Sequence, residues 1–428
     1  MLNYRNYSHL FLIILFLSFQ AQQFSIPLDL TPIKPYMLLV IFALIVFLIK
    51  CLSKQKLFFK FIWIDYFFIL FYGFMASCIS RASNAQLAVH LLIGLCVLGC
   101  AYFVIRLSCY KLSVDALRDI LVLVGKLFFY ISFFWFIFGV VLHYGFNIAL
   151  SIIDDDDAAS YLYGLYMEGE SIPRLRGICD SPNNFGMYAV IFAPIVLLCL
   201  KRVTVFFGFV LILSVALTLS ATTYIAFGFM LLIWAFRKSF TMKAVTLTPN
   251  RLFKFSVFII VVMALLISIS NSPLIDQIND VIIARLEHAE TGSGRWELWD
   301  YALNLISERP LLGYGLNQSR ELLLPLRALK STHNNILELL LEGGIGALFF
   351  YILLLGGCLV AIYKVKYRTQ DRDWMYLAFA GTFVISNANV NLYNESFVLL
   401  LALIAGFVGK SSSVNYGEKL GKDKNRNS

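Results

Sequence analysis

The chain has 428 residues, of which 60% are hydrophobic and only 14% are charged. Soluble globular domains carry about one quarter of charged residues, so this composition excludes a soluble fold. The formal net charge of +9 does not indicate a nucleic-acid partner, because in a membrane protein the positions of Lys and Arg are more informative than their sum. We therefore predict an all-α, polytopic integral membrane protein that binds no nucleic acid.

Residues 1–20 resemble a signal peptide, because a short positively flanked segment precedes the apolar stretch Leu10–Phe19. No small-residue cleavage site ends this segment convincingly, although Gln20–Gln22 comes close. We interpret the segment as an uncleaved first membrane span.

Apolar runs of about 17 to 25 residues recur along the chain, and this length matches the hydrocarbon core of a bilayer. They predict about twelve transmembrane helices, and an even number places both termini on the same side. The predicted spans are Ser8–Gln20, Tyr36–Leu52, Phe58–Ile79, Ala85–Ile105, Asp119–His143, Asn184–Leu200, Val203–Leu219, Thr222–Phe236, Phe253–Ile269, Asn335–Tyr363, Met375–Val390 and Ser396–Val408.

Basic residues gather in alternate connections between these spans, which by the positive-inside rule marks those connections as cytoplasmic. These basic residues are Lys50, Lys54, Lys56, Lys60, Arg106, Lys111, Arg118, Lys201, Arg202, Arg237, Lys238, Lys243, Arg251, Lys254, Lys364, Lys366, Arg368 and Arg372. The intervening connections hold most of the carboxylates. Both termini are therefore predicted to be cytoplasmic, and the polar, basic tail 411–428 is predicted to be disordered.

Two outer segments, 144–183 and 271–334, are too long to be simple turns, and function concentrates in such loops. In the second, Trp296, Trp299 and Leu303 recur at steps of three and four residues, which predicts an amphipathic helix at the membrane interface.

The outer segments retain several cations that the predicted orientation disfavours. They are Arg174, Arg176, Arg285, Arg295, Arg309, Arg320, Arg327 and Lys330. Guanidinium groups bind phosphate through two parallel hydrogen bonds, so a lipid-linked diphosphate at the outer surface is one explanation. Ion pairs with Glu287, Glu290, Glu297 or Glu308 are an equally good explanation for any single one of them.

Two short clusters favour anion binding. The segment Pro173–Gly177 brings Arg174 and Arg176 next to a glycine just before the turn Ser181–Asn184. In Gly292–Arg295, glycines and Ser293 precede the Trp-containing helix, so backbone N–H groups and the Arg295 guanidinium could converge on one anion.

A third cluster, Ser331–Asn335, opens the span that contains Glu338 and Glu342. His333 has the side chain whose ordinary pKa lies nearest neutrality, so it could accept a proton from a sugar hydroxyl. The alternative is a histidine that only caps or anchors the helix. Both glutamates share a helix face with Asn334, and buried carboxylates there would indicate a polar cavity.

Other polar residues are assigned structural roles. Asp65 and Lys126 are predicted at similar depth and form a structural ion pair, in preference to a proton relay. The run Asp154–Asp157 lacks the spacing of a calcium loop and is interpreted as a solvated acidic loop. The eight cysteines include no CxxC motif or Cys/His cluster, so no metal site is predicted, and a Cys78–Cys179 bridge stays an alternative to two free thiols.

Taken in order, these clusters resemble the O-antigen ligase and O-antigen polymerase superfamily of bacterial surface-polysaccharide enzymes. The resemblance is carried by Gly-Ser-Gly-Arg-Trp at 292–296, Pro-Leu-Leu-Gly-Tyr-Gly at 310–315, His-Asn-Asn at 333–335 and Glu-Gly-Gly-Ile-Gly at 342–346. Arg176–Asn184 matches more weakly. Many relatives have a Ser-Arg pair near the outer end of the seventh span, whereas this chain has Ser220–Thr223 without an arginine.

The resemblance implies a transmembrane glycosyltransferase domain over residues 1–410, with its ligase-like core at about 176–363, in a bacterial inner membrane. It implies an undecaprenyl-diphosphate-linked oligosaccharide as donor and no metal or other cofactor. Arg176 and Arg295 would bind the diphosphate and His333 would act on the acceptor hydroxyl. Arg174, Ser293, Asn334 and Glu338 would support them.

The acceptor is left open between two activities of the superfamily. A polymerase extends a lipid-linked repeat unit, whereas a ligase transfers finished glycan to a lipid A core, and we favour the polymerase because no feature obviously accommodates a lipid A core. Membrane lipid and a chain-length regulator complete the expected partners. A lipid-linked oligosaccharide flippase or transporter is the alternative of another class, although such proteins place their charges near the membrane midplane.

Overall fold

The computed structural model of the chain describes residues 4–26, 32–53, 60–110, 112–154, 159–168, 172–200, 203–241, 295–326, 331–365, 369–389 and 392–424. It contains 6 helices that are long and apolar enough to cross a membrane, judged by length and composition. They are Pro35–Leu52, Trp63–Arg81, Ala85–Tyr110, Val114–Gly145, Pro182–Cys199 and Asn335–Tyr363, and shorter apolar helices cover Ser8–Gln20, Val205–Ala216 and Ala221–Arg237. The predicted helical, multi-pass membrane protein is confirmed, while the number of twelve spans stays a prediction.

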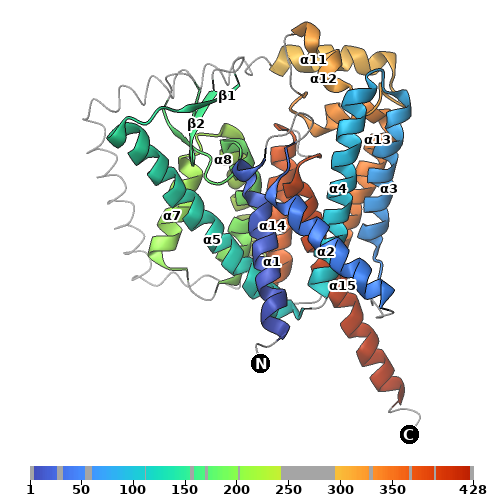
Figure 1. The fold of residues 1–428 in the computed structure, drawn as a ribbon. Helices are drawn as coiled ribbons and strands as arrows, with labels where there is room; N and C mark the ends of the chain where they lie inside the picture. Colours follow the sequence, from blue (N-terminus) through green and yellow to red (C-terminus); the bar gives the residue numbers. More distant parts are fainter. Residues whose placement is uncertain are drawn as a thin grey trace.

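Every predicted span except Phe253–Ile269, which lies outside the described residues, overlaps a helix. The long helices are α1 (Tyr4–Gln20), α2 (Pro35–Leu52), α3 (Trp63–Ser77), α4 (Ala85–Tyr110), α5 (Val114–Val140), α6 (Pro182–Cys199), α7 (Val205–Ala216), α8 (Ala221–Thr241), α13 (Asn335–Tyr363), α14 (Thr369–Ser386) and α15 (Glu395–Lys424). Figure 1 shows both termini at the same end of this bundle. We call the end of the bundle that holds both termini the terminal end, and the opposite end the loop end.

Helix α6 lies at the centre of the bundle, in contact with α5, α8 and α14. Nearly its whole length is buried, which explains why it is apolar on all sides instead of amphipathic. Gly125 of α5 allows close approach, since a Cβ there would meet Val196 and Phe192 of α6. Helix α4 packs on α15 and α3 packs on α13, so helices from the early and late parts of the chain pack together.

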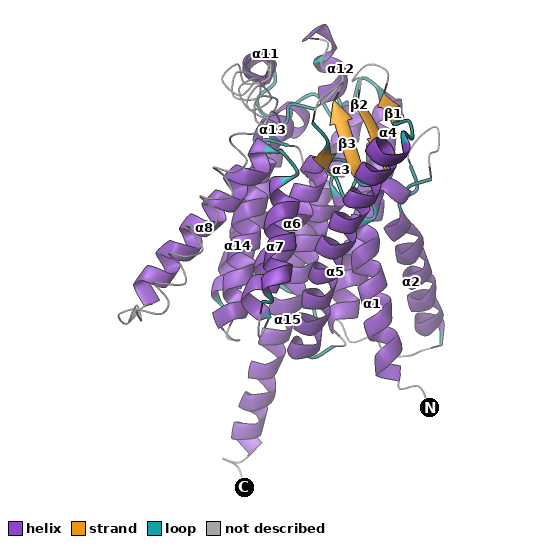
Figure 2. Cartoon of the chain, turned by 90° about the vertical axis from the view of Figure 1, so that its left-hand side faces the viewer, coloured by secondary structure: helices purple, strands orange, loops and turns teal. Residues whose placement is uncertain are grey.

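A small antiparallel sheet and two helices cover the loop end (Figures 1 and 2). The sheet has the order β1 (Ser151–Asp154), β2 (Ala159–Leu162), β3 (Leu165–Glu168), β4 (Arg174–Leu175). The helices are α11 (Arg295–Glu308) and the short α12 (Ser319–Leu322). The prediction of an all-α fold missed this sheet, because strands of two to four residues inside a loop leave no periodic signal.

Helix α15 continues as far as Lys424 (Figure 1), and the disorder predicted for the tail 411–428 stays a prediction. The Lys410 ammonium donates to the Tyr110 carbonyl at 3.0 Å, which fixes α15 where the polar tail begins. Extending an existing helix avoids the cost of nucleation, so a polar segment can continue it.

Asp65 is paired differently from the prediction. Its Oδ1 accepts from the Tyr102 hydroxyl at 2.7 Å and lies 3.3 Å from Arg106 Nε, and Asp65 and Arg106 are both fully buried. Helix α3 packs on α4 and α13, whereas Lys126 lies on α5, which packs on α1, α6 and α7. The predicted Asp65–Lys126 pair was wrong because depth in the membrane does not determine which helices are neighbours.

Replacement of Asp65 should destabilise the bundle far more than replacement of Lys126. Asp65→Ala leaves the Arg106 charge buried without its carboxylate, which costs about 3–5 kcal/mol. We expect a clear fall in Tm of the purified protein in detergent, with Lys126→Ala close to the wild type. Equal falls in both variants would contradict the Asp65–Arg106 assignment.

Candidate active site

The turn before α13 holds the predicted catalytic histidine in an unusual backbone conformation. His333 has a φ of 54°, in the left-handed region that few non-glycine residues adopt. On its C-terminal side, the Asn334 side chain caps α13 by accepting from the N–H groups of Ile336 and Leu337 at 2.9 and 3.3 Å. Such conformations persist where surrounding contacts enforce them and are frequent at functional sites.

Glu338 holds this turn in place through hydrogen bonds. Its Oε2 accepts from both the Thr332 N–H at 3.0 Å and the Thr332 hydroxyl at 2.8 Å, and its Oε1 accepts from Ser319 at 2.6 Å. Glu338 is only 3% exposed, so these bonds replace the water that the carboxylate gives up. Glu338 therefore fixes Thr332, the residue next to His333, and its predicted supporting role stays a prediction.

Glu342, one turn further along α13, is also fully buried. The Ser319 hydroxyl lies 3.1 Å from its Oε1, and the Tyr393 hydroxyl donates to its Oε2. Protein side chains thus satisfy both glutamates, and a polar cavity is not needed to explain their burial.

A break in α13 lies beside this carboxylate. Gly344 has φ 63° and ψ −160°, and the turn Pro310–Gly315 bonds to the interrupted backbone. The bonds are Tyr314 N–H to Leu341 O at 2.7 Å, Gly315 N–H to Glu342 O at 2.9 Å and Ile345 N–H to Pro310 O at 2.9 Å. Two of the motifs that carry the family resemblance, at 310–315 and 342–346, are therefore one structural unit.

Tyr393, Asn394 and Glu395, at the junction of α14 and α15, join this unit to the rest of the loop end. Tyr393 reaches Glu342, the Asn394 amide lies 3.5 Å from the Asn184 side chain at the start of α6, and Glu395 accepts from Gln22 at 2.6 Å and Lys34 at 2.8 Å. None of these three residues was predicted from the sequence. The signal available was the polar, Asn-rich segment between two apolar spans.

Arg176, expected to bind diphosphate, is 4% exposed and binds the protein's own oxygen atoms. Its guanidinium donates to Tyr163 O at 2.8 Å, Asp180 O at 3.3 Å and Gln23 Oε1 at 3.2 Å, and stacks 4.2 Å from the centre of the Tyr161 ring. Burial lowers the pKa of Arg176 to about 10, so it stays charged at neutral pH. Direct binding of a substrate by Arg176 would require these hydrogen bonds and the stacking contact to rearrange.

Arg174 is buried in the same way, at 5% exposed. Its Nε donates to Thr218 O at 3.0 Å, beyond the end of α7, and its guanidinium lies 5.7 Å from the centre of the Tyr166 ring. Both arginines therefore fix the sheet to the helices beneath it.

Charged side chains beside Arg176 form a second polar cluster. Lys34 lies 2.8 Å from Glu395 and 3.9 Å from Asp180. Burial raises the pKa of Asp180. Burial alone would lower the pKa of Lys34, but the carboxylates of Glu395 and Asp180 outweigh it and raise that pKa, so the lysine remains charged.

Arg295 is the first residue of α11, and Ser293 lies outside the described residues. The helix is tied to the histidine turn by Trp299, whose Nε1 donates to Thr332 O at 2.9 Å. The helix that begins at Arg295 and the turn that holds His333 are therefore neighbouring elements.

Cys78 and Cys179 are both buried, free thiols, so the alternative of a bridge between them is not found. Cys78 accepts from Arg81 Nη2 at 2.9 Å.

The architecture and site define a multi-pass membrane protein whose polar centre lies at one end of a helix bundle. Residues 205–352 match the family described as O-antigen ligase, which covers about a third of the chain and includes Arg295, His333 and both buried glutamates. This match supports a place for the chain in the O-antigen ligase and polymerase superfamily, and with it a role as a membrane enzyme of surface-polysaccharide assembly. Comparison with curated proteins gives no significant match.

The break in α13 should tolerate no side chain. A Cβ at Gly344 would overlap backbone atoms of Leu311 and Leu312, and the left-handed φ adds about 1–2 kcal/mol of strain. We expect Gly344→Ala to lower the Tm and to abolish glycan transfer. The control is Gly356→Ala in the same helix, where no other atom lies within 4 Å of the added Cβ, and an equal loss there would contradict the assignment.

Proposed function

We propose that the protein is a metal-independent glycosyltransferase that moves glycan from undecaprenyl diphosphate to an acceptor sugar hydroxyl, as an O-antigen-type polymerase. The observation that carries the proposal is the hydrogen bond from Trp299 to Thr332 O, because it joins the helix that begins at Arg295 to the turn that holds His333. A cation that stabilises the diphosphate leaving group and an acceptor for the hydroxyl proton are the two groups that such a transfer needs.

The loop end is proposed to face the periplasm. The opposite, terminal end carries the basic residues Arg106, Arg118 and Lys410. By the positive-inside rule, this end lies on the cytoplasmic side of a bacterial inner membrane. A lipid-linked donor carries its diphosphate at the membrane surface, so its glycan would reach the loop end from the outer leaflet.

In the proposed reaction, His333 takes the proton from the acceptor hydroxyl as its oxygen attacks the anomeric carbon. The bond between that carbon and the diphosphate oxygen breaks, with inversion, and the pair of electrons leaves with undecaprenyl diphosphate. Arg295 stabilises the charge that builds on the leaving group. Thr332, Asn334 and Glu338 keep the His333 turn in the conformation that this step requires.

Arg176 is assigned a positioning role in place of direct contact. It holds the segment that leads into the N-terminus of α6 and places a buried positive charge behind it. Arg174 supports the sheet beside it.

Replacement of His333 or Arg295 by Ala should abolish glycan transfer and leave the Tm and membrane insertion unchanged. The assay is extension of a synthetic polyprenyl-diphosphate repeat unit by purified protein. Matched controls are His143→Ala and Arg309→Ala, since the exposed His143 contacts the Ile148 carbonyl near it in the chain and Arg309 stacks on Tyr314 at the surface. Normal product length in the His333 variant would refute the assigned role.

The same assay separates the related activities. Lengthened lipid-linked products support the polymerase, whereas transfer that occurs only when a lipid A core is added identifies a ligase. Translocation without bond formation identifies a flippase. Addition of a chain-length regulator should change the product distribution of a polymerase only.

The two roles considered for Arg176 differ in kinetic effect. Arg176→Lys retains the charge but loses the planar fork, so a positioning role predicts a lower kcat with a donor KM within about twofold of the wild type. A direct grip on the diphosphate predicts a raised donor KM instead. Steady-state kinetics with the synthetic donor decides between them.

A further inference from the structure

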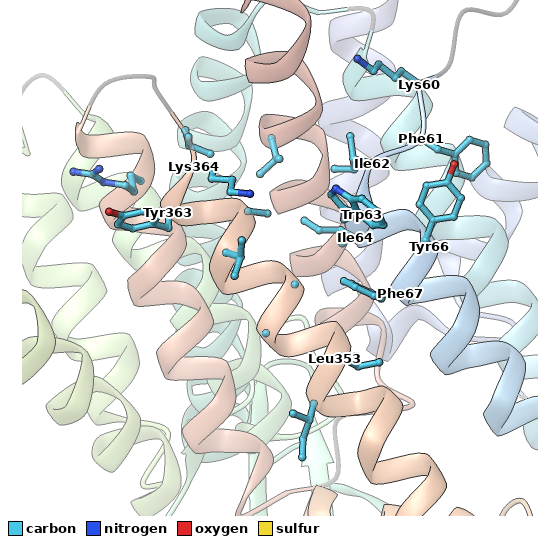
Figure 3. A pocket seen from close by; sticks show the side chains of 18 of the residues that line it. Lys60, Phe61, Ile62, Trp63, Ile64, Tyr66, Phe67, Leu353, Tyr363 and Lys364 are labelled. Carbon is cyan, nitrogen blue, oxygen red and sulfur yellow. The ribbon is translucent and has the colours of Figure 1, made fainter.

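A groove opens between α3 and α13 at the terminal end, far from the candidate active site. Trp63, Ile64 and Phe67 of α3 line one side, and Ile352, Gly356 and Val360 of α13 line the other. Figure 3 shows Lys60, Trp63 and Lys364 at one end of this groove and Leu353 at the other. The groove therefore runs from the terminal end into the level of the membrane.

The walls of the groove suit a hydrocarbon chain. Ile352 and Val360 are 58% and 52% exposed although both lie on a membrane-spanning helix. No other atom lies within 4 Å of a Cβ added at Gly356, so this glycine leaves open space on the groove wall. At Gly357, by contrast, a Cβ would meet the Phe67 ring, so α3 and α13 close together there.

The charges around the groove are all of one sign. Among the described residues its lining includes Lys60, Lys364 and Arg372 but no carboxylate. The Nε of Arg372 is buried and has no hydrogen-bond partner within the described part of the chain. The nearby acids are engaged elsewhere, since Asp371 pairs with Arg118 and Asp373 with Arg237. The groove thus combines apolar walls with a positively charged end.

We propose that this groove binds an anionic glycerophospholipid of the leaflet at the terminal end. One acyl chain lies along Gly356 between α3 and α13, and the headgroup phosphate accepts from Lys364 and Arg372. Trp63 and Tyr363 are 74% and 72% exposed at this end of the groove. Aromatic side chains of this kind are enriched at the level of the lipid headgroups. Basic pockets between transmembrane helices are suited to anionic headgroups.

Two other occupants fit less well. A second copy of the chain docked by two-fold symmetry would bring the same cations together. The polyprenyl-diphosphate donor must present its glycan to His333 at the loop end, whereas the cations of this groove lie at the opposite end. The inference does not depend on the proposed transfer reaction.

The test compares phosphatidylglycerol with phosphatidylcholine on the full-length protein. Native mass spectrometry after release from nanodiscs of a one-to-one mixture measures the lipid retained, and we expect selective retention of phosphatidylglycerol. Lys364→Gln and Arg372→Gln should each weaken that retention about fivefold. Gly356→Leu should displace the lipid by filling the groove, with Gly99→Leu as control, since Gly99 of α4 also has open space.

Equal retention of both lipids by the wild type would overturn the proposal, as would unchanged selectivity in the three groove variants. Appearance of a dimer that these variants disrupt would identify a second copy as the occupant, and loss of polyprenyl-diphosphate binding in them would identify the donor. Either result also overturns it. Glycan transfer by His333 can fail or succeed without changing any of these outcomes.

Discussion

The loop end depends on two buried carboxylates of α13 that are satisfied by side chains from distant parts of the sequence. Glu338 and Glu342 share the Ser319 hydroxyl, and Thr332 and Tyr393 complete their hydrogen bonds. An unpaired buried carboxylate is costly, so these contacts select one arrangement of the turn before α13, of α12 and of the α14–α15 connection. His333 has its unusual backbone conformation within that arrangement.

The two ends of the bundle use charge differently. At the terminal end the buried cations are paired, Arg106 with Asp65 and Arg118 with Asp371, which fixes neighbouring helices. At the loop end Arg176 is surrounded mainly by carbonyl oxygens and an aromatic ring, so its charge is only partly compensated. In the proposed function, such a cation would favour an anionic diphosphate at the adjacent surface.

The loop-end motifs owe their proximity to a broken helix. Because Gly344 interrupts α13, its carbonyl groups become available to the turn Pro310–Gly315, and the same interruption keeps Glu342 beside Tyr393. Trp299 then adds α11 to this unit. An unbroken helix would satisfy those carbonyl groups internally and leave the turn without partners.

Hydropathy alone predicted nearly all the described membrane helices, because a helix in lipid must satisfy its backbone internally and so appears as a long apolar run. The motifs at 292–296, 310–315, 333–335 and 342–346 also indicated, without a structure, the family that residues 205–352 match. The sequence could not predict which helices pair. Asp65 binds Arg106 instead of Lys126. Tyr393 and Glu395 join the polar network through partners more than fifty residues away in the chain. The burial of the Arg176 side chain could not be predicted from the sequence either. Sequence periodicity determines which segments are helical and apolar, whereas only the packing of those helices decides which polar groups meet, because such contacts depend on neighbours that are distant in the chain.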